Sequence, residues 1–196
     1  MNLISGFEYV VTRFQALPQL GSGLHHDTVA IVPFLLGATP GIIDRYATSD
    51  EQALLAKVRY NRLLDVFTGV TCYSLQNHLR TTAIGIGQVE VDEIYVGVDK
   101  HGAHYVFPVQ AKGGRDQIGI VQAEQDIAVC QERFAALICR AIATQFISPT
   151  DIAMFELGIQ DDQIVVHAER HDRLVQTAEL SHDELAAYRD RVSSPD

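Results

Sequence analysis

The stretch Val89–Lys112, VEVDEIYVGVDKHGAHYVFPVQAK, decides the fold. Two runs rich in β-branched and aromatic residues flank a short polar segment, which is typical of a β-hairpin. Lys100-His101-Gly102 fits a three-residue loop with glycine in the left-handed conformation. That loop pairs Asp99 with Ala103, and the pairing continues along both strands until Asp92 faces Gln110 and Glu90 faces Lys112. The stretch therefore predicts two antiparallel strands with a defined register.

This register sorts the side chains of the hairpin onto two faces, because opposed residues project to the same side. The odd-numbered face is apolar and predicts a core made of Val89, Val91, Tyr95, Phe107, Val109 and Ala111. The even-numbered face is apolar near the turn but ends in Glu90, Asp92, Gln110 and Lys112. Pro108 removes a ladder donor and indicates an edge or a bulge. A one-residue slip would place the polar partners on opposite faces, so the candidate site depends on the register.

These polar residues are of the types that cut a phosphodiester with a divalent metal. Asp92 and the side-chain oxygen of Gln110 are hard ligands for Mg²⁺ or Mn²⁺, and the Ala111 carbonyl and waters would complete an octahedron. The metal would polarise a phosphoryl oxygen and lower the pKa of a bound water. Lys112 would contact the phosphate and position or deprotonate the attacking water. Glu90, beside Lys112, either holds that lysine or binds a second metal.

The arrangement resembles the PD-(D/E)XK nuclease superfamily, which includes many restriction and repair endonucleases. By that resemblance, Asp92 takes the place of the metal-binding acid, Gln110 the Glu/Gln place and Lys112 the place of the lysine. The resemblance implies a Mg²⁺-dependent endodeoxyribonuclease of restriction type that acts on double-stranded DNA. Such a function favours a homodimer with one active site for each strand.

The sequence departs from the family pattern in two respects. Gln110 is uncharged, a variant that the superfamily tolerates but that weakens metal binding. The acid that the family often carries on the preceding helix is not obvious, since Gln76 sits near its expected place and Glu51 lies farther back. Which acid completes the site, Glu51, Glu90 or neither, stays open.

Other interpretations of the same residues stand beside this one. Glu90 and Lys112 form an ordinary cross-strand ion pair in the first alternative, and Asp92 and Gln110 a satisfied polar pair at the end of a sheet. A non-catalytic DNA-binding or assembly subunit on the same fold is a second alternative. An unrelated α/β interaction domain, in which the polar cluster only fixes the strand register, is a third.

Composition indicates a folded protein of the cytoplasm. Hydrophobic residues make up 47% and charged residues 20% of the 196 positions, and no run of 18 apolar residues predicts a membrane helix. The first residues lack the features of a signal peptide, and three widely spaced cysteines predict reduced thiols. The net charge of −10 argues against indiscriminate coating of nucleic acid but leaves room for a locally basic cleft. The residues that we expect to contact DNA are Arg80, Arg115, Asn77 and Arg62.

We expect one α/β domain over residues 1–196, restriction-endonuclease-like, with a central mixed sheet flanked by helices. Residues 1–70 are expected to form an N-terminal helical extension and residues 71–196 the α/β core. Capping residues, periodicity and glycines predict the other elements. These are an apolar strand within 29–36, a helix from Thr48 or Ser49 to Gly69, a short helix over Tyr73–Thr81, a long helix from Asp116 or Gln117 to Ala143, a second hairpin turned at 160–162 and a final helix from Ser181.

Overall fold

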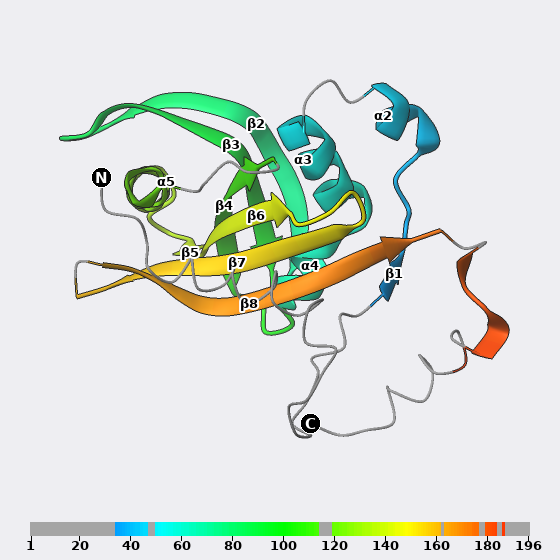
Figure 1. The fold of residues 1–196 in the computed structure, drawn as a ribbon. Coiled ribbons are helices and arrows are strands. Elements are labelled where there is room, and N and C mark those ends of the chain that lie inside the picture. Colours follow the sequence, from blue (N-terminus) through cyan, green and yellow to red (C-terminus); the bar gives the residue numbers. More distant parts are fainter. Residues whose placement is uncertain are drawn as a thin grey trace, which may run out of the picture.

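The computed structural model describes residues 34–46, 50–113, 119–161, 163–176, 179–183 and 186. Within them, helices lie on both faces of one large β-sheet (Figure 1). The elements are β1 (Phe34–Leu36), α2 (Gly41–Tyr46), α3 (Asp50–Tyr60), α4 (Leu63–Thr68), β2 (Thr71–Ala83), β3 (Gly87–Val98), β4 (His104–Lys112), α5 (Ile120–Arg133), β5 (Ile138–Cys139), β6 (Ala141–Phe146), β7 (Asp151–Gln160) and β8 (Gln163–Val175).

The sheet is mixed and has the strand order β1-β8-β7-β6-β4-β3-β2, with β5 beside β4. Strands β2, β3 and β4 form an antiparallel meander, and β6, β7 and β8 form another. The two meanders join where β4 and β6 run parallel, because the helix α5 carries the chain back across the sheet between them. The expected α/β architecture, with a central mixed sheet flanked by helices, is confirmed.

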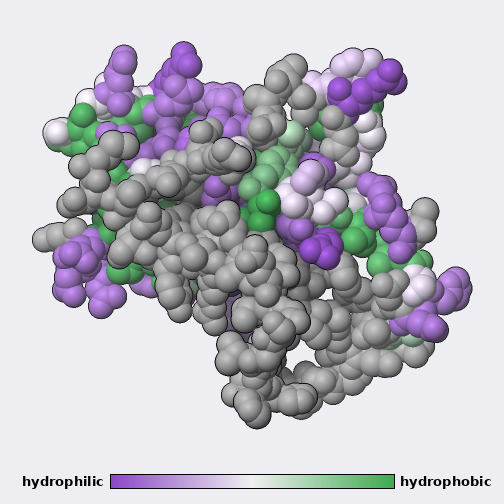
Figure 2. Space-filling view, in the orientation of Figure 1, coloured by the Kyte–Doolittle hydropathy of each residue, from purple (hydrophilic) through white to green (hydrophobic). Residues whose placement is uncertain are grey.

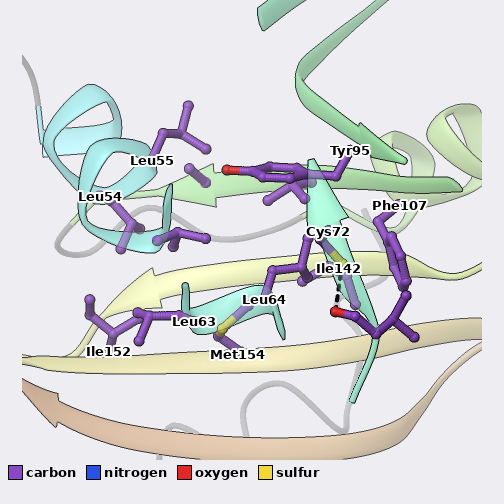
Figure 3. Packing of buried hydrophobic residues seen from close by; sticks show 14 of the residues in the cluster. Leu54, Leu55, Leu63, Leu64, Cys72, Tyr95, Phe107, Ile142, Ile152 and Met154 are labelled. Carbon is purple, nitrogen blue, oxygen red and sulfur yellow. Dashed lines mark hydrogen bonds between the residues drawn. The ribbon is translucent and has the colours of Figure 1, made fainter. Parts of the chain in front are cut away.

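Two helical layers cover the sheet. Helices α3 and α4 bury Leu54, Leu55, Leu63 and Leu64 against one face, where Figure 3 shows them around Ile142, Ile152 and Met154. Helix α5 covers the other face through Ala123 and Ile127, which pack on the strands β6, β7 and β8. Helices α3 and α4, expected within an N-terminal extension, therefore belong to the main hydrophobic core.

The predicted register of the β3–β4 hairpin is confirmed from Val98–His104 to Glu93–Val109, and Gly102 has the positive φ that its loop requires. The predicted single core face is wrong in one respect. Tyr95 and Phe107 pack under α3 and α4, whereas Val89 and Val91 pack against α5. The change of face lies near a register shift of the β2–β3 ladder between Ser74 and Gln76, beyond which the outer half of both strands curves over α5 (Figure 1).

The helix predicted over Tyr73–Thr81 is wrong, because these residues lie in β2. This strand is at the edge of the sheet and exposes most of its side chains, so its sequence lacks the alternation that marks a half-buried strand. Its ladder with β3, from Thr71–Val98 to Ala83–Gly87, holds it extended. A register shift between Ser74 and Gln76 interrupts that ladder.

The remaining predicted elements agree with the structure in part. The first helix is broken at Arg62, which has a φ of 55°, and ends at Gly69 as predicted. Helix α5 ends at Arg133, so the predicted extension to Ala143 is wrong and β5 and β6 follow instead. The second hairpin is confirmed as β7 and β8. Most of the strand predicted within 29–36 and of the helix predicted after Ser181 lies outside the described residues.

The end of β2 and the start of β3, which meet at the turn between Ala83 and Gly87, form an arm. This arm is largely hydrophilic in the upper left of Figure 2. At its tip, Ile84 and Ile86 are exposed hydrophobic residues. In the part of the chain that the structure describes, no helix has the length and apolar character needed to cross a membrane.

Candidate functional site

The candidate site lies where β3 and β4 part. The ladder between them ends at Glu93 and Val109; beyond it β3 continues beside β2, and Gln110 to Lys112 pair with β6. The expected ladder pairs Asp92–Gln110 and Glu90–Lys112 are therefore wrong, because the strands have already separated. The separation leaves room at the end of β4 for side chains from both helical layers.

Asp92 bridges the gap between the two strands. Its Oδ2 accepts a hydrogen bond from the backbone N–H of Ala111 at 2.9 Å, which replaces a ladder bond by a side-chain bond. Burial raises the pKa of the Asp92 carboxyl, while the Ala111 hydrogen bond and the positive charge of Lys112 lower it. The charge of Glu51 raises the same pKa, so these two acids lie within electrostatic reach of each other.

Lys112 meets an acid from a distant part of the sequence. Its Nζ lies 3.1 Å from Oε1 of Glu51, which is in the first turn of α3. The lysine side chain is only 16% exposed, whereas that of Glu51 is 40% exposed, so the contact is partly shielded from water. Of the acids left open by the sequence, the structure brings Glu51 to the lysine. Its distance from the hairpin in the sequence is why the sequence alone left this choice open.

Glu90 lies on the exposed side of the arm, away from Lys112. Its Oε2 is 3.1 Å from Nε of Arg80, and its Oε1 is 3.7 Å from Nδ1 of His78. Nε2 of His78 also lies 2.7 Å from the amide nitrogen of Gln52 on α3. Glu90 therefore contacts β2 and not the lysine, and the expected contact between Glu90 and Lys112 is wrong.

Gln110 is buried between β3 and α5. Its Oε1 accepts a hydrogen bond from Nε2 of Gln122 at 2.7 Å. Its own Nε2 donates to the backbone carbonyl of Glu90 at 3.4 Å. With 2% of its surface exposed, the side chain has a fixed orientation.

Asp126 of α5 is a member of the site that the sequence prediction missed. Burial raises its pKa to about 7, a hydrogen bond from Gln110 lowers it, the charge of Asp92 raises it and that of Lys112 lowers it. Its Oδ1 is buried and has no hydrogen-bond partner among the described residues. The signal in the sequence was an acid on the same helical stripe as Ala123, Ile127 and Cys130, which are buried.

The donor set suits a hard cation only if amide and carbonyl oxygens take part. Across the described residues, no three His, Cys, Asp or Glu side chains are arranged to hold a metal on their own. Asp92, Glu51, the Gln110 amide and the Ala111 carbonyl are oxygen donors of the kind that Mg²⁺ accepts. Asp126, whose buried Oδ1 has no hydrogen-bond partner among the described residues, interacts electrostatically with Asp92 and Lys112 of this group.

The residues expected to contact DNA are spread along β2 and its neighbours. Arg80 is exposed, with 80% of its side chain accessible, and lies with Glu90 beside a hollow of about 700 Å³. Asn77 accepts a hydrogen bond from Arg59 at 3.0 Å, and Arg62 pairs with Asp65. Arg115 lies outside the described residues. Arg80 and Asn77 thus share one strand, whereas Arg62 lies at the junction of α3 and α4.

Comparison with known proteins adds no identity to this geometry. No protein-family model matches the chain, and no curated protein matches it.

Proposed function

We propose that this protein is a metal-dependent endodeoxyribonuclease of the PD-(D/E)XK kind that hydrolyses phosphodiester bonds of double-stranded DNA. The order of elements supports the proposal: helix α3, the meander β2–β3–β4, helix α5 and then β6 parallel to β4. The candidate residues lie at the end of β4 where this crossover begins. Ligands of α/β sheets bind at such places.

The contact between Lys112 and Glu51 is the observation that carries the proposal. It adds a carboxylate from the helix before the meander to the Asp92 carboxylate and the lysine of β4. An ordinary cross-strand ion pair would join Lys112 to Glu90 and would need no residue from a helix. Lys112 instead pairs with Glu51 of α3, and Glu90 pairs with Arg80. Two carboxylates and a shielded lysine are the parts that hydrolysis of a phosphodiester uses.

Each residue has a distinct task in the proposed reaction. Asp92, Glu51, the Gln110 side-chain oxygen and the Ala111 carbonyl would hold Mg²⁺ or Mn²⁺, which supplies Lewis acidity when bound. Lys112, positioned by Glu51, contacts the phosphoryl oxygen and the attacking water. Arg80 and Asn77 on the exposed edge strand contact the DNA backbone. Cleavage of both strands by one site each would require a homodimer.

The test is cleavage of supercoiled and linear DNA with Mg²⁺ by the full chain and by Asp92→Ala and Lys112→Ala. We expect cleavage by the wild type and its loss in both variants. Lys100→Ala is the matched control, because this lysine is exposed at the loop of the same hairpin, at the other end of β4. Equal activity in all proteins, or none in any across a range of DNA substrates and metals, contradicts the proposal.

One observation favours a second candidate, a non-catalytic DNA-binding or assembly subunit on the same fold. Asp92, Glu51 and Gln110 already have partners within the protein, so these oxygens are satisfied without a metal. Such a subunit would bind DNA or a protein partner independently of metal, and Lys112→Ala would leave that binding unchanged.

A further inference from the structure

A cavity of about 240 Å³ lies between the helices α3 and α4 and the strands β2 and β3. None of the residues proposed to hold the metal lines it. The buried part of its lining includes Val58, Leu64, Cys72 and Tyr95, and the exposed part includes Arg62 and Tyr73. The cavity therefore reaches from the surface beside β2 into the core.

The buried part of this cavity carries a hydroxyl group without a partner. Tyr95 is 4% exposed, and its Oη has no hydrogen-bond partner among the described residues. Figure 3 shows this hydroxyl on the side of α3. Glu93, which accepts from Arg59 and Ser74 of the lining at 2.7 and 2.5 Å, also has a buried oxygen, Oε2, without a partner there. Buried polar atoms are normally hydrogen-bonded, so a bound group with polar edges would complete this part of the cavity.

The charges and the size of the cavity favour a small neutral ligand. Both guanidinium groups of the lining already have acidic partners. Arg59 lies 2.7 Å from Glu93. Arg62 pairs with Asp65. A phosphate or carboxylate would have to displace these acids. The volume is also below the roughly 300 to 1,000 Å³ of sites for drug-sized molecules, so a single ring system is the appropriate size.

The cavity lies close to the candidate metal site, because one helix contributes to both. Arg59 follows Glu51 by eight positions on α3, which is about 12 Å along the helix axis. B-DNA rises about 3.4 Å per nucleotide, so this distance corresponds to a few nucleotides. Two residues that we expected to contact DNA are also at the cavity. Arg62 lines it, and Asn77 accepts from Arg59 at 3.0 Å.

We propose that the cavity binds one nucleobase of the DNA, turned out of the duplex near the bond that is cut. The Tyr95 hydroxyl, which both donates and accepts, hydrogen-bonds to the edge of the base. Tyr73 and Arg62 on the exposed side supply an aromatic ring and a guanidinium plane, on which unpaired bases stack. This inference rests on the proposed nuclease function and specifies how the protein engages its DNA.

The experiment measures whether the protein prefers a base that is already unpaired. Binding of the full chain is compared for two short duplexes that carry 2-aminopurine at the centre, opposite thymine or in a mismatch, with Ca²⁺ in place of Mg²⁺ so that the DNA stays intact. A mismatched base costs less free energy to turn out of the helix. We expect the wild type to bind the mismatched duplex at least about tenfold more tightly, with a rise in 2-aminopurine fluorescence as the base leaves the stack.

Two variants test whether the cavity causes this preference. Tyr95→Phe keeps the ring and removes the hydroxyl, so it should reduce the preference by about threefold to tenfold. Ser74→Phe places a ring at the wall of the cavity and should abolish the preference. Tyr105→Phe is the matched control, because it removes a tyrosine hydroxyl of the same hairpin that donates to Asp99 at 3.1 Å. It should bind both duplexes as the wild type does. Circular dichroism confirms that each variant is folded.

The outcomes separate this inference from the proposed function. Wild-type protein that cleaves DNA with Mg²⁺ but binds the two duplexes within about twofold overturns the inference and leaves the proposed function standing. A preference that persists in both cavity variants does the same. A preference that these variants lose, in a protein that cleaves no DNA, supports the cavity and overturns the proposed function. Wild-type protein that neither binds nor cleaves DNA overturns both.

Discussion

Nζ of Lys112 at the end of β4 and Oε1 of Glu51 at the start of α3 lie 3.1 Å apart, although 61 positions separate them in the sequence. The contact joins the helical layer to the sheet at the place where β3 and β4 part. A second link between α3 and the sheet lies farther along the helix, where Arg59 donates to the buried Glu93 of β3. The two ion pairs together fix α3 over the candidate site.

Removal of the Glu51 carboxylate tests whether it belongs to the site. Glu51→Gln keeps the shape of the side chain but removes the charge that holds Lys112 and faces Asp92. We expect DNA cleavage to fall by about 10- to 100-fold in single-turnover assays, with the fold unchanged. Glu124→Gln, which removes one negative charge from α5 at a side chain that is not among its buried residues, should keep wild-type activity. Wild-type activity in Glu51→Gln beside an inactive Asp92→Ala would show that the acid lies outside the site.

Loss of the Arg59 guanidinium should destabilise the whole domain. Glu93 is fully buried and accepts from Nε and Nη2 of Arg59 at 3.0 and 2.7 Å. Arg59→Ala leaves that buried carboxylate without its positive partner, which should cost about 3 kcal/mol, less than for a fully buried pair because the Arg59 side chain is 35% exposed. Urea unfolding measures the free energy of unfolding. Arg80→Ala breaks the exposed pair with Glu90 and should cost at most about 1 kcal/mol, so a similar loss in both variants contradicts the prediction.

Stability should depend on pH through Asp126. Burial raises its pKa from 3.8 to about 7, so between these values the folded protein holds a proton that the unfolded chain has released. The free energy of unfolding therefore falls as the pH rises from about 4 to about 7, and it stays low above that. In Asp126→Asn this loss is absent.

The expected difference in pH dependence is large enough to measure by unfolding. At about pH 8 the variant should be more stable than the wild type by an amount on the order of 4 kcal/mol, and at about pH 4 the two should agree. Asp92 and Lys112, the charged groups that face Asp126 from β3 and β4, are unchanged in this comparison. A stability difference that is the same at both pH values would show that burial does not shift this carboxyl.

Two glycines of the sheet should respond differently to alanine. A Cβ at Gly97 would lie 2.7 Å from Cγ1 of Val70 and 3.2 Å from Cε2 of Phe107, both in the core. Gly97→Ala should therefore lower the free energy of unfolding by about 1 to 3 kcal/mol through overpacking. Gly158→Ala also meets a ring, that of His167, but this side chain is exposed and can turn away. Thermal unfolding that shows the larger loss in Gly158→Ala would contradict this ranking.

Local sequence patterns predicted the loop of the β3–β4 hairpin and the end of α4. Gly102 determined the loop and therefore the register of β3 and β4, and Gly69 marked the end of α4. Strand β2 was missed because its extended form is imposed by β3 and its exposed polar side chains show no alternation. The end of α5 was missed because the apolar residues after Arg133 suit a buried strand as well as a helix.

The strand residues of the candidate site were predictable, whereas Glu51 was only one of the alternatives left open and Asp126 was missed. Asp92, Gln110 and Lys112 follow from the hairpin, although the strands part before the expected pairs form. Glu51 and Asp126 come from two helices on opposite faces of the sheet, and only tertiary packing brings them to the end of β4. Their charges decide what the site can bind.

The separation of β3 and β4 also determines how closely the groups of the candidate site are held in position. The two strands diverge inside a packed sheet, and the helices on both of its faces are fixed by buried contacts. Groups carried by strands and helices keep their positions more closely than groups carried by loops. The spacing of the carboxylates therefore depends on where β3 and β4 separate, and a change in the core beneath these strands would alter the site without replacing any of its residues.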